Sequence, residues 1–222
     1  MGLERSIQKM TELILIRHGE TAWNRERRMQ GQTDTPLSDT GRAQAQAVGE
    51  RLARYPFAAL YSSDLSRAWD TATAIARASG HEIRREPALR ERTFGVFEGL
   101  TYDEMAQRYP DEHARFSGRD PDYAVPGGES PRQFFDRSLA CLESIAAAHA
   151  GASVVVVTHG LVLDTLYRAA RNLPMEAKRD APLLNASLNT FRRTEAAWIE
   201  VSWGDVAHLA EVGVTRYDGR AV

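Results

Sequence analysis

The sequence contains a single cysteine and no long apolar stretch. One cysteine, Cys141, among 222 residues excludes a disulfide within the chain and is typical of proteins in a reducing cytoplasm. Cys141 lies at helical spacing from Phe134 and Ile145, which predicts a buried, inert thiol. No segment approaches the roughly 20 apolar residues of a membrane span, and the N-terminus lacks the apolar core of a signal peptide. We therefore expect a cytoplasmic protein with no membrane partner.

The sequence also lacks a large excess of either charge. A formal net charge of −2 gives no field over the whole molecule that would attract nucleic acid or an anionic lipid surface. Partners are therefore expected to be small molecules. Only Lys9 and Lys178 of the 28 basic residues are lysines, so an arginine near a motif is informative only through its position.

Metal-binding and nucleotide-binding patterns are missing as well. His81, His113, His149 and His208 are scattered without the spacing of metal ligands, and residues 127–128 lack the lysine of a phosphate-binding P-loop. We predict neither a metal site nor a cofactor.

What is present is the composition of an ordinary globular protein, with 43% hydrophobic and 26% charged residues. This length favours one domain with one sizeable core. We predict a single domain over residues 1–222, in which residues 1–10 form an N-terminal extension.

Short apolar runs at 13–16, 58–61 and 154–157 predict buried strands of the parallel type. Residues 186–192 and 196–203 predict a hairpin that extends the sheet, and its apolar edge is a candidate homodimer contact.

Two segments outside these strands carry apolar residues at helical spacing and predict helices, and a third helix is expected from about Asp64 to Gly80. Alternating strands and helices predict an α/β fold, a three-layer α/β/α sandwich with a mostly parallel sheet and helices on both faces. Residues 109–128 are expected to form a long functional loop. The two helical patterns are Ala45, Val48, Leu52 and Tyr55, capped near Ser38, and Phe135, Leu139, Leu142 and Ile145, capped by Glu129 or Ser130.

Two histidines, His18 and His159, follow buried strands directly, and each precedes a glycine. Loops at the carboxyl ends of parallel strands form the sites of such folds. Because imidazole is partly unprotonated near neutral pH, His18 is a suitable nucleophile for phosphoryl transfer, and the preceding Arg17 is a suitable ligand for phosphate oxygens.

The order of motifs resembles the histidine phosphatase superfamily, which includes phosphoglycerate mutases and many phosphatases of small molecules. Arg17-His18-Gly19-Glu20-Thr21 is similar to its signature, and the similarity extends from about Leu13 to about Ser202. The resemblance implies a phosphoglycerate mutase-like fold and a small phosphorylated metabolite as partner. Further matching segments are Asn24, 31–38, 62–68, 89–91, 94–95, 98–99, 128–130 and 157–160.

The resemblance also implies roles for individual residues. His18 would become phosphohistidine, Arg17, Arg67 and His159 would complete the phosphate pocket, and Glu91 would be the proton donor. Asn24 and Gly160 would add contacts to phosphate. Glu98 lies close in sequence and is the rival candidate for the acid.

Three functions remain open, led by a metal-independent phosphatase that acts on a small phosphomonoester through phosphohistidine. A phosphoglycerate mutase is the first alternative. The resemblance implies a longer insertion and more cationic contacts for a mutase, and this chain has Phe94 and Tyr102 where mutases tend to have Tyr and Lys. Neither lysine lies in the segment after Glu91 where a mutase would place these cationic contacts, although Arg108, Arg115 and Arg119 could supply them. A non-catalytic phosphate-binding scaffold is the second alternative.

Overall fold

The computed structural model describes residues 10–210, 212, 216 and 217. Of the predicted N-terminal extension, residues 1–9 lie outside the described residues.

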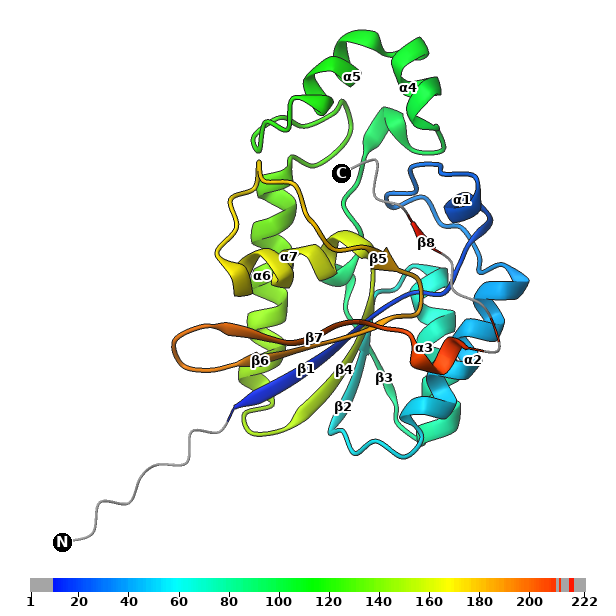
Figure 1. The fold of residues 1–222 in the computed structure, drawn as a ribbon, viewed down its shortest axis with the longest axis vertical. Coiled ribbons are helices and arrows are strands. Elements are labelled where there is room, and N and C mark those ends of the chain that lie inside the picture. The colour runs from blue at the N-terminus through cyan, green and yellow to red at the C-terminus, as the bar shows by residue number, and fades with distance from the viewer. Residues whose placement is uncertain (1–9, 211, 213–215, 218–222) are drawn as a thin grey trace, which may run out of the picture.

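A six-stranded mixed sheet forms the centre of the fold, in the order β3-β2-β4-β1-β6-β7 (Figure 1). The first four strands of that order are parallel, and β6 pairs antiparallel with both β1 and β7. The predicted strands and the hairpin are all found, with the hairpin displaced by about two residues. The strands are β1 (Thr11–Arg17), β2 (Ala59–Ser62), β3 (Ile83–Arg85), β4 (Ser153–Thr158), β6 (Leu188–Arg193) and β7 (Trp198–Asp205).

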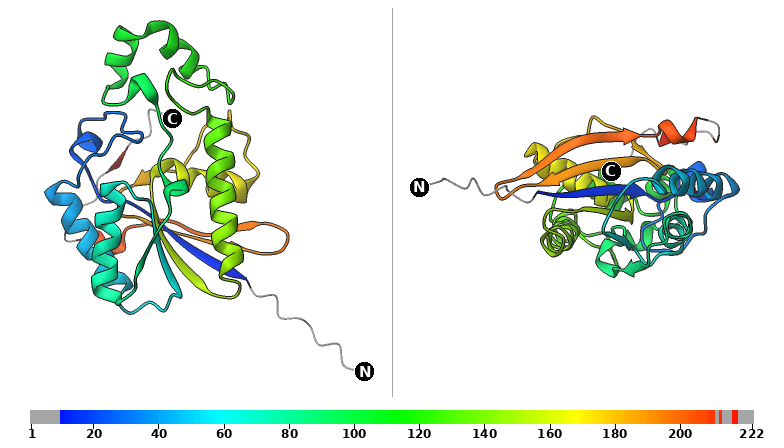
Figure 2. Two further views of the ribbon diagram at one scale, coloured as in Figure 1. Left: turned by 180° about the vertical axis from the view of Figure 1, so that it is seen from behind. Right: turned by 90° about the horizontal axis from the view of Figure 1, so that it is seen from below.

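Helices cover both faces of this sheet, as predicted. Alternate residues of β1 point to opposite faces, so that Leu13 and Leu15 pack in one core and Ile14 and Ile16 in the other. The first core is covered by α6 (Pro131–Ala148) and α7 (Gly160–Arg171), and the second by α2 (Asp39–Leu52) and α3 (Ser66–Ser79). Figure 2 shows α6 from behind, running beside the sheet.

The helix ends follow from capping chemistry. The Ser38 hydroxyl accepts a hydrogen bond from the Gly41 N–H at the start of α2, and Ser130, not Glu129, caps α6 by accepting from Gln133. Gly80 ends α3 at a φ of 77°, a conformation that favours glycine.

Two predictions from the sequence were wrong, one about the end of a helix and one about a loop. Helix α2 stops at Leu52, and Tyr55 is 41% exposed, outside the helix and the core. The expected loop 109–128 contains helix α5 (Pro110–Ser117), because a proline in the first turn followed by two acidic residues favours a helix start. Cys141 is buried, as predicted, and burial raises its pKa to about 12.

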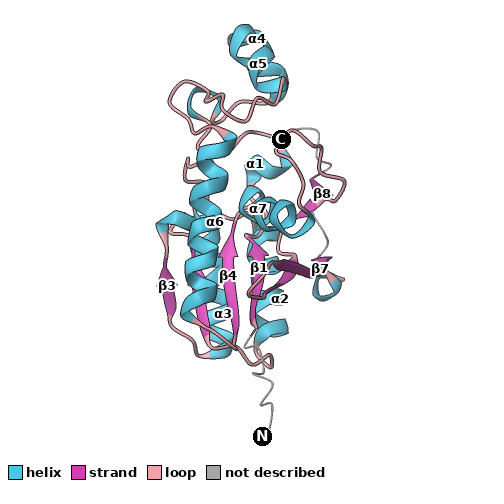
Figure 3. Cartoon of the chain, turned by 90° about the vertical axis from the view of Figure 1, so that its left-hand side faces the viewer, coloured by secondary structure: helices cyan, strands magenta, loops and turns pink. Residues whose placement is uncertain are grey.

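Helix α5 and its neighbour α4 (Tyr102–Arg108) lie beyond the end of the sheet, at the top of Figures 1 and 3. In Figure 3, β4 runs toward that end, so the two helices lie on the side to which the carboxyl ends of β4 and its parallel neighbour β1 point. The remaining short elements are α1 (Ala22–Arg25), β5 (Leu183–Leu184), β8 (Arg216–Tyr217) and the 3₁₀ turns Pro87–Leu89, Gly95–Phe97 and Ala207–Leu209.

Candidate active site

The pairing of β1 with β4 brings His18 and His159 together. Arg17 is opposite Thr158 in the parallel register, and the His18 N–H donates to the Thr158 carbonyl over 2.9 Å. The two imidazole rings, which follow these strands, lie 5.2 Å apart between centroids. Adjacent parallel strands therefore place both histidines at one edge of the sheet.

The His18 ring has one nitrogen engaged and one available. Its Nδ1–H donates to the Gly19 carbonyl over 2.7 Å, because a carbonyl can only accept. In the neutral ring Nε2 then carries the lone pair. Burial, with the positive charges of Arg67 and Arg17, lowers the pKa of His18 well below its ordinary value of 6.5. The ring is therefore neutral near pH 7, as a nucleophile requires.

His159 precedes α7 as its N-cap residue and is fully buried. Its Nε2 lies 2.8 Å from the Ser63 hydroxyl at the end of β2. Within the described part of the chain its Nδ1 has no hydrogen-bond partner. Burial, together with Arg67, lowers the pKa of this histidine well below 6.5 as well. The ring is thus neutral and has one polar atom left for a ligand.

Two guanidinium groups flank His18. Arg17 donates to the Leu183 carbonyl over 2.6 Å, and Arg67 donates to the carbonyls of Thr33 and Gly31 over 3.0 and 2.7 Å. Arg67 is fully buried, and burial lowers its pKa to about 10, so it remains charged at neutral pH. Fixed cations of this kind suit planar contacts with phosphate oxygens.

Asn24 and Gly160 serve local structure at the same site. The Asn24 side-chain oxygen accepts hydrogen bonds from the N–H and the hydroxyl of Thr21, and also from the Asn185 amide over 3.2 Å. A Cβ at Gly160 would lie 3.1 Å from the Leu183 Cδ1, a tight contact, so glycine lets Leu183 approach the start of α7.

Glu91 lines the same small pocket as His18. One carboxylate oxygen accepts from the Arg92 N–H over 2.9 Å and the other from the Leu161 N–H over 3.2 Å. Burial raises the pKa of this carboxyl above 4.5 in spite of those hydrogen bonds. A raised pKa favours the protonated form that a general acid needs.

Glu98, the rival acid, is occupied with structure. It accepts hydrogen bonds from the backbone N–H groups of Gln32, Thr33 and Phe94 and from two threonine hydroxyls. Burial raises its pKa, but these donors outweigh burial and lower the pKa overall. Gly31 has a φ of 55°, and a Cβ there would collide with this carboxylate. Glu98 therefore fixes the loop whose carbonyls hold Arg67.

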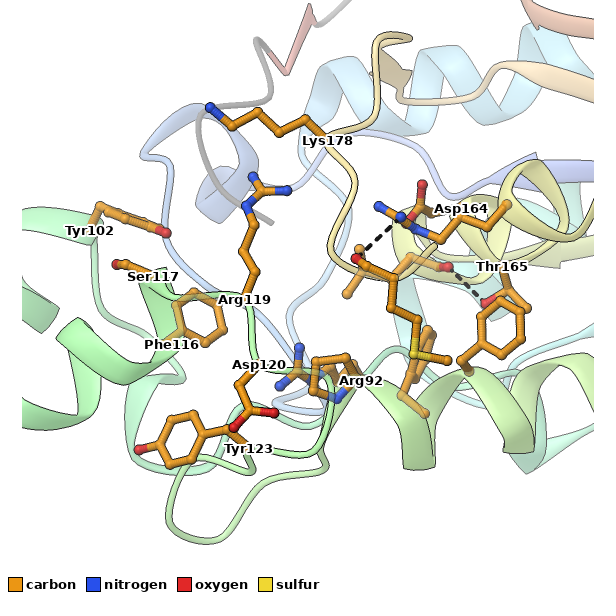
Figure 4. A pocket seen from close by; sticks show the side chains of 16 residues that line it. Arg92, Tyr102, Phe116, Ser117, Arg119, Asp120, Tyr123, Asp164, Thr165 and Lys178 are labelled. Atoms are coloured by element: carbon orange, nitrogen blue, oxygen red, sulfur yellow. Dashed lines mark hydrogen bonds and ion pairs between the residues drawn. The ribbon is translucent and has the colours of Figure 1, made fainter. Parts of the chain in front are cut away.

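All of the predicted site residues except His159 line a pocket of about 60 Å³. His159 is next to His18 but does not line this pocket. Leu161 lines it and also lines a second, outer cavity of about 340 Å³, so the two are adjacent. Figure 4 shows the side chains around the outer cavity. The predicted residues that line the smaller pocket are Arg17, His18, Asn24, Arg67, Glu91 and Gly160.

Several residues at the site were missed or misjudged from the sequence. Arg28, which no motif singled out, lines the small pocket and donates to Glu104 over 2.6 Å and to the Gly99 carbonyl over 2.8 Å. Lys178 lines the outer cavity with Arg119, which corrects the expectation that neither lysine is placed for a grip there. Lys178 lies in the turn after α7, which Arg168 holds through its carbonyls, and no motif in the sequence indicated that placement.

Metal centres and membrane spans are the other kinds of feature that bear on function. No group of three or more potential metal-ligating side chains occurs within the described residues. None of the helices in that part of the chain has the length and apolar character needed to cross a bilayer.

With this fold and this constellation, the chain belongs to the histidine phosphatase superfamily (branch 1), whose family model matches residues 13–206. It is thus an enzyme of the phosphoglycerate mutase family.

Among its relatives, "Phosphoglycerate mutase-like protein 4" of Arabidopsis thaliana is 43% identical over 91% of this chain and 88% of its own length. A "Metal-independent phosphoserine phosphatase" of the same plant is 42% identical over 96% and 90%. The solved structure of Bacillus stearothermophilus YhfR superposes with a TM-score of 0.82 at 36% identity, covering 90% of this chain and 99% of that one.

Proposed function

We propose that the protein is a metal-independent phosphatase that hydrolyses a small phosphomonoester through a phosphohistidine on His18. The observation that carries this proposal is the neutral His18 ring, which is anchored by Nδ1 and lines a pocket between Arg17 and Arg67. A relative named as a metal-independent phosphoserine phosphatase supports the same class of reaction.

In the first half-reaction the Nε2 lone pair of His18 attacks phosphorus and forms the N–P bond. The bond between phosphorus and the leaving oxygen breaks, and that oxygen takes the proton of Glu91. Arg17 and Arg67 bind the phosphoryl oxygens, whose charge they stabilise without reorganisation. His159 donates from Nδ1, which requires its Nε2 to accept from the Ser63 hydroxyl.

In the second half-reaction the Glu91 carboxylate removes a proton from water. The water oxygen attacks phosphorus, the N–P bond breaks, and inorganic phosphate leaves. Glu91 is protonated again and His18 recovers its lone pair, so atoms and charges return to their starting state.

A phosphoglycerate mutase is the second candidate. It is favoured by the cations Arg119 and Lys178 in the outer cavity and by a relative named as mutase-like. A mutase must protect phosphohistidine from water and hold a bisphosphorylated intermediate. With 3-phosphoglycerate we expect either release of phosphate or no reaction, and no stimulation by 2,3-bisphosphoglycerate. Bisphosphate-dependent formation of 2-phosphoglycerate, faster than release of phosphate, would show a mutase.

The deciding experiment measures phosphate release from 4-nitrophenyl phosphate with excess chelator, together with trapping of acid-labile phosphohistidine. The wild-type protein should retain its rate in chelator. His18→Ala should lose phosphohistidine and several orders of magnitude of turnover, because no other pocket group can accept the phosphoryl. His149→Ala, a change far from the pocket, should behave as wild type. A rate abolished by chelator and restored by Mg²⁺ would refute the metal-free mechanism.

We also propose that the enzyme works in the cytoplasm, without a nucleic acid partner, and forms a homodimer. Edge strand β7 carries Ile199 and Val201, which are 49% and 45% exposed, and exposed apolar edge strands are templates for pairing. Light scattering after size exclusion tests this contact, since Ile199→Asp should yield a monomer. A wild-type monomer at micromolar concentration would contradict the dimer.

A further inference from the structure

The outer cavity has both apolar and charged side chains in its lining, and it adjoins Glu91. Leu161 lines both spaces, and its N–H binds the Glu91 carboxylate. The leaving oxygen must lie at Glu91 to receive its proton, so the body of the leaving group extends into the outer cavity. The walls of that cavity are built from Phe116, Tyr123, Phe134, Phe135, Leu161 and Met175, among others.

One wall is held rigidly. The Phe116 ring meets Phe94 and Phe97 edge-to-face at 6.1 and 5.5 Å between centroids, and the guanidinium of Arg92 lies 5.8 Å from the Phe116 ring. Phe94 in turn lines the phosphate pocket. A fixed aromatic wall next to the phosphate pocket suits a flat apolar leaving group.

The charges of the cavity are unevenly compensated. Asp164 is paired with Arg168 over 2.7 Å and with Arg179 over 3.2 Å, and Asp120 accepts from the Asp122 N–H over 2.9 Å. Within the described chain, by contrast, neither Arg119 nor Lys178 forms an ion pair. In Figure 4 both extend toward the same side of the cavity. Arg92 and Asp120 also line the cavity without an ion pair among the described residues, so three cations and one carboxylate of the lining are unpaired, and the cations are in excess.

The backbone at Arg119 follows from the end of α5. Arg119 comes after the C-cap residue Gly118 and has a φ of 57°, the left-handed conformation in which helices commonly end. Its N–H donates to the Phe116 carbonyl over 3.2 Å, so the helix end fixes Arg119 next to the aromatic wall.

We propose that the outer cavity selects phosphomonoesters whose leaving group has a flat apolar body and an acidic group at its far end, held by Arg119 and Lys178. This inference rests on the proposed phosphatase function. It separates the favoured substrates from O-phosphoserine, whose small zwitterionic leaving group has no flat apolar body and fills little of the cavity.

The test compares kcat/KM for 4-carboxyphenyl phosphate, phenyl phosphate and O-phosphoserine at low salt. The wild-type enzyme should prefer the carboxylated aryl ester to O-phosphoserine. Replacing both Arg119 and Lys178 by Met should lower kcat/KM for 4-carboxyphenyl phosphate about tenfold, and leave phenyl phosphate within about twofold, since exposed ionic contacts are individually weak. For each ester the kcat/KM of the variant is divided by that of the wild type, which cancels the difference in acidity between the leaving groups.

Two controls separate charge from packing. Lys178→Arg keeps the cation and should keep the ratio of kcat/KM for 4-carboxyphenyl phosphate to that for phenyl phosphate, and high salt should lower this ratio in the wild type because these side chains are near the surface. Equal losses on both aryl esters, or a wild-type preference for O-phosphoserine, would overturn the proposal. Absence of phosphate release from all three esters would instead refute the phosphatase function itself.

Discussion

The Ser63 hydroxyl lies 2.8 Å from Nε2 of His159. The Ser62 hydroxyl one residue earlier donates instead to the Ser63 carbonyl over 2.8 Å. Two neighbouring buried serines at the end of β2 thus make comparable hydrogen bonds, and only one of them touches a histidine. The pair offers a matched test of how the His159 tautomer is set.

Ser63→Ala should lower kcat about threefold to tenfold, since it removes one hydrogen bond worth about 1 kcal/mol from the tautomer that donates through Nδ1. KM should change less than kcat. Ser62→Ala is the control and should have a similar melting temperature but nearly normal kcat. Equal kcat losses in the two variants would show that Ser63 acts only on stability.

Arg137 and Glu129 form a two-point ion pair, with 2.8 Å between each nitrogen and its carboxylate oxygen. Arg137 also donates to the carbonyls of Ala88 and Arg90, so the pair anchors the segment that carries Glu91. Arg137→Met should therefore displace Glu91 and lower kcat on alkyl phosphates about tenfold or more. The loss on aryl phosphates should be smaller, because an aryl oxide leaves readily without a proton.

The same helix supplies the control for that variant. Arg132 pairs with Asp122, but this pair is exposed and lies away from Glu91. Arg132→Met should leave both kinds of substrate nearly unaffected. A uniform loss for Arg137→Met on alkyl and aryl esters would contradict a role in positioning the acid.

Glu91→Gln should reduce kcat on alkyl phosphates by a factor of about 10² to 10⁴, the usual contribution of general acid catalysis. An aryl oxide leaves readily without a proton, so 4-nitrophenyl phosphate should suffer much less in the first half-reaction. Burst kinetics separate that step from hydrolysis of phosphohistidine. Identical losses on both ester types would make Glu91 a structural residue.

The pH profile of kcat/KM follows from two opposite shifts. His18 must be neutral, and its lowered pKa places the loss of activity on acidification below pH 6.5. Glu91 must be protonated, and its raised pKa places the loss of activity on alkalinisation above pH 4.5. For alkyl esters the profile should be a bell between these limbs.

A single variant can separate the two limbs. Glu91→Gln should abolish the alkaline limb and preserve the acidic one. The comparison is made with the same alkyl ester over the same pH range. A wild-type acidic limb that lies above pH 6.5 would be inconsistent with a buried, neutral His18.

The sequence was most informative where local pattern and tertiary position coincide. Strands β1 and β4 are continuous apolar runs, so the pattern alone predicts that the histidines following them share one sheet edge. The family resemblance is confirmed over residues 13–206. By contrast, the choice between Glu91 and Glu98 depends on how many N–H groups each accepts, and the spacing of residues does not carry that information.

The segments between strands were harder to predict, because their conformation also depends on hydrogen bonds that the spacing of residues does not reveal. Helix α5 was missed because its prolines and charges are also typical of loops. The position of Lys178 depends on Arg168, which donates to the carbonyls of Pro174, Met175 and Ala177 and thereby shapes the turn after α7. Interactions of side chains with distant backbone have no periodic signature in a sequence.

The placement of α4 and α5 beyond the sheet has a consequence for how such an enzyme could diverge. The groups proposed for phosphoryl transfer stand largely at strand ends whose register is fixed by two cores, whereas the outer cavity draws Phe116 and Arg119 from α5 and its end, and Lys178 from the turn after α7. Surface segments tolerate insertion and exchange far better than sheet pairings do. Grafting these two segments between homologues should therefore transfer selectivity for the leaving group and leave the phosphoryl chemistry of the recipient unchanged.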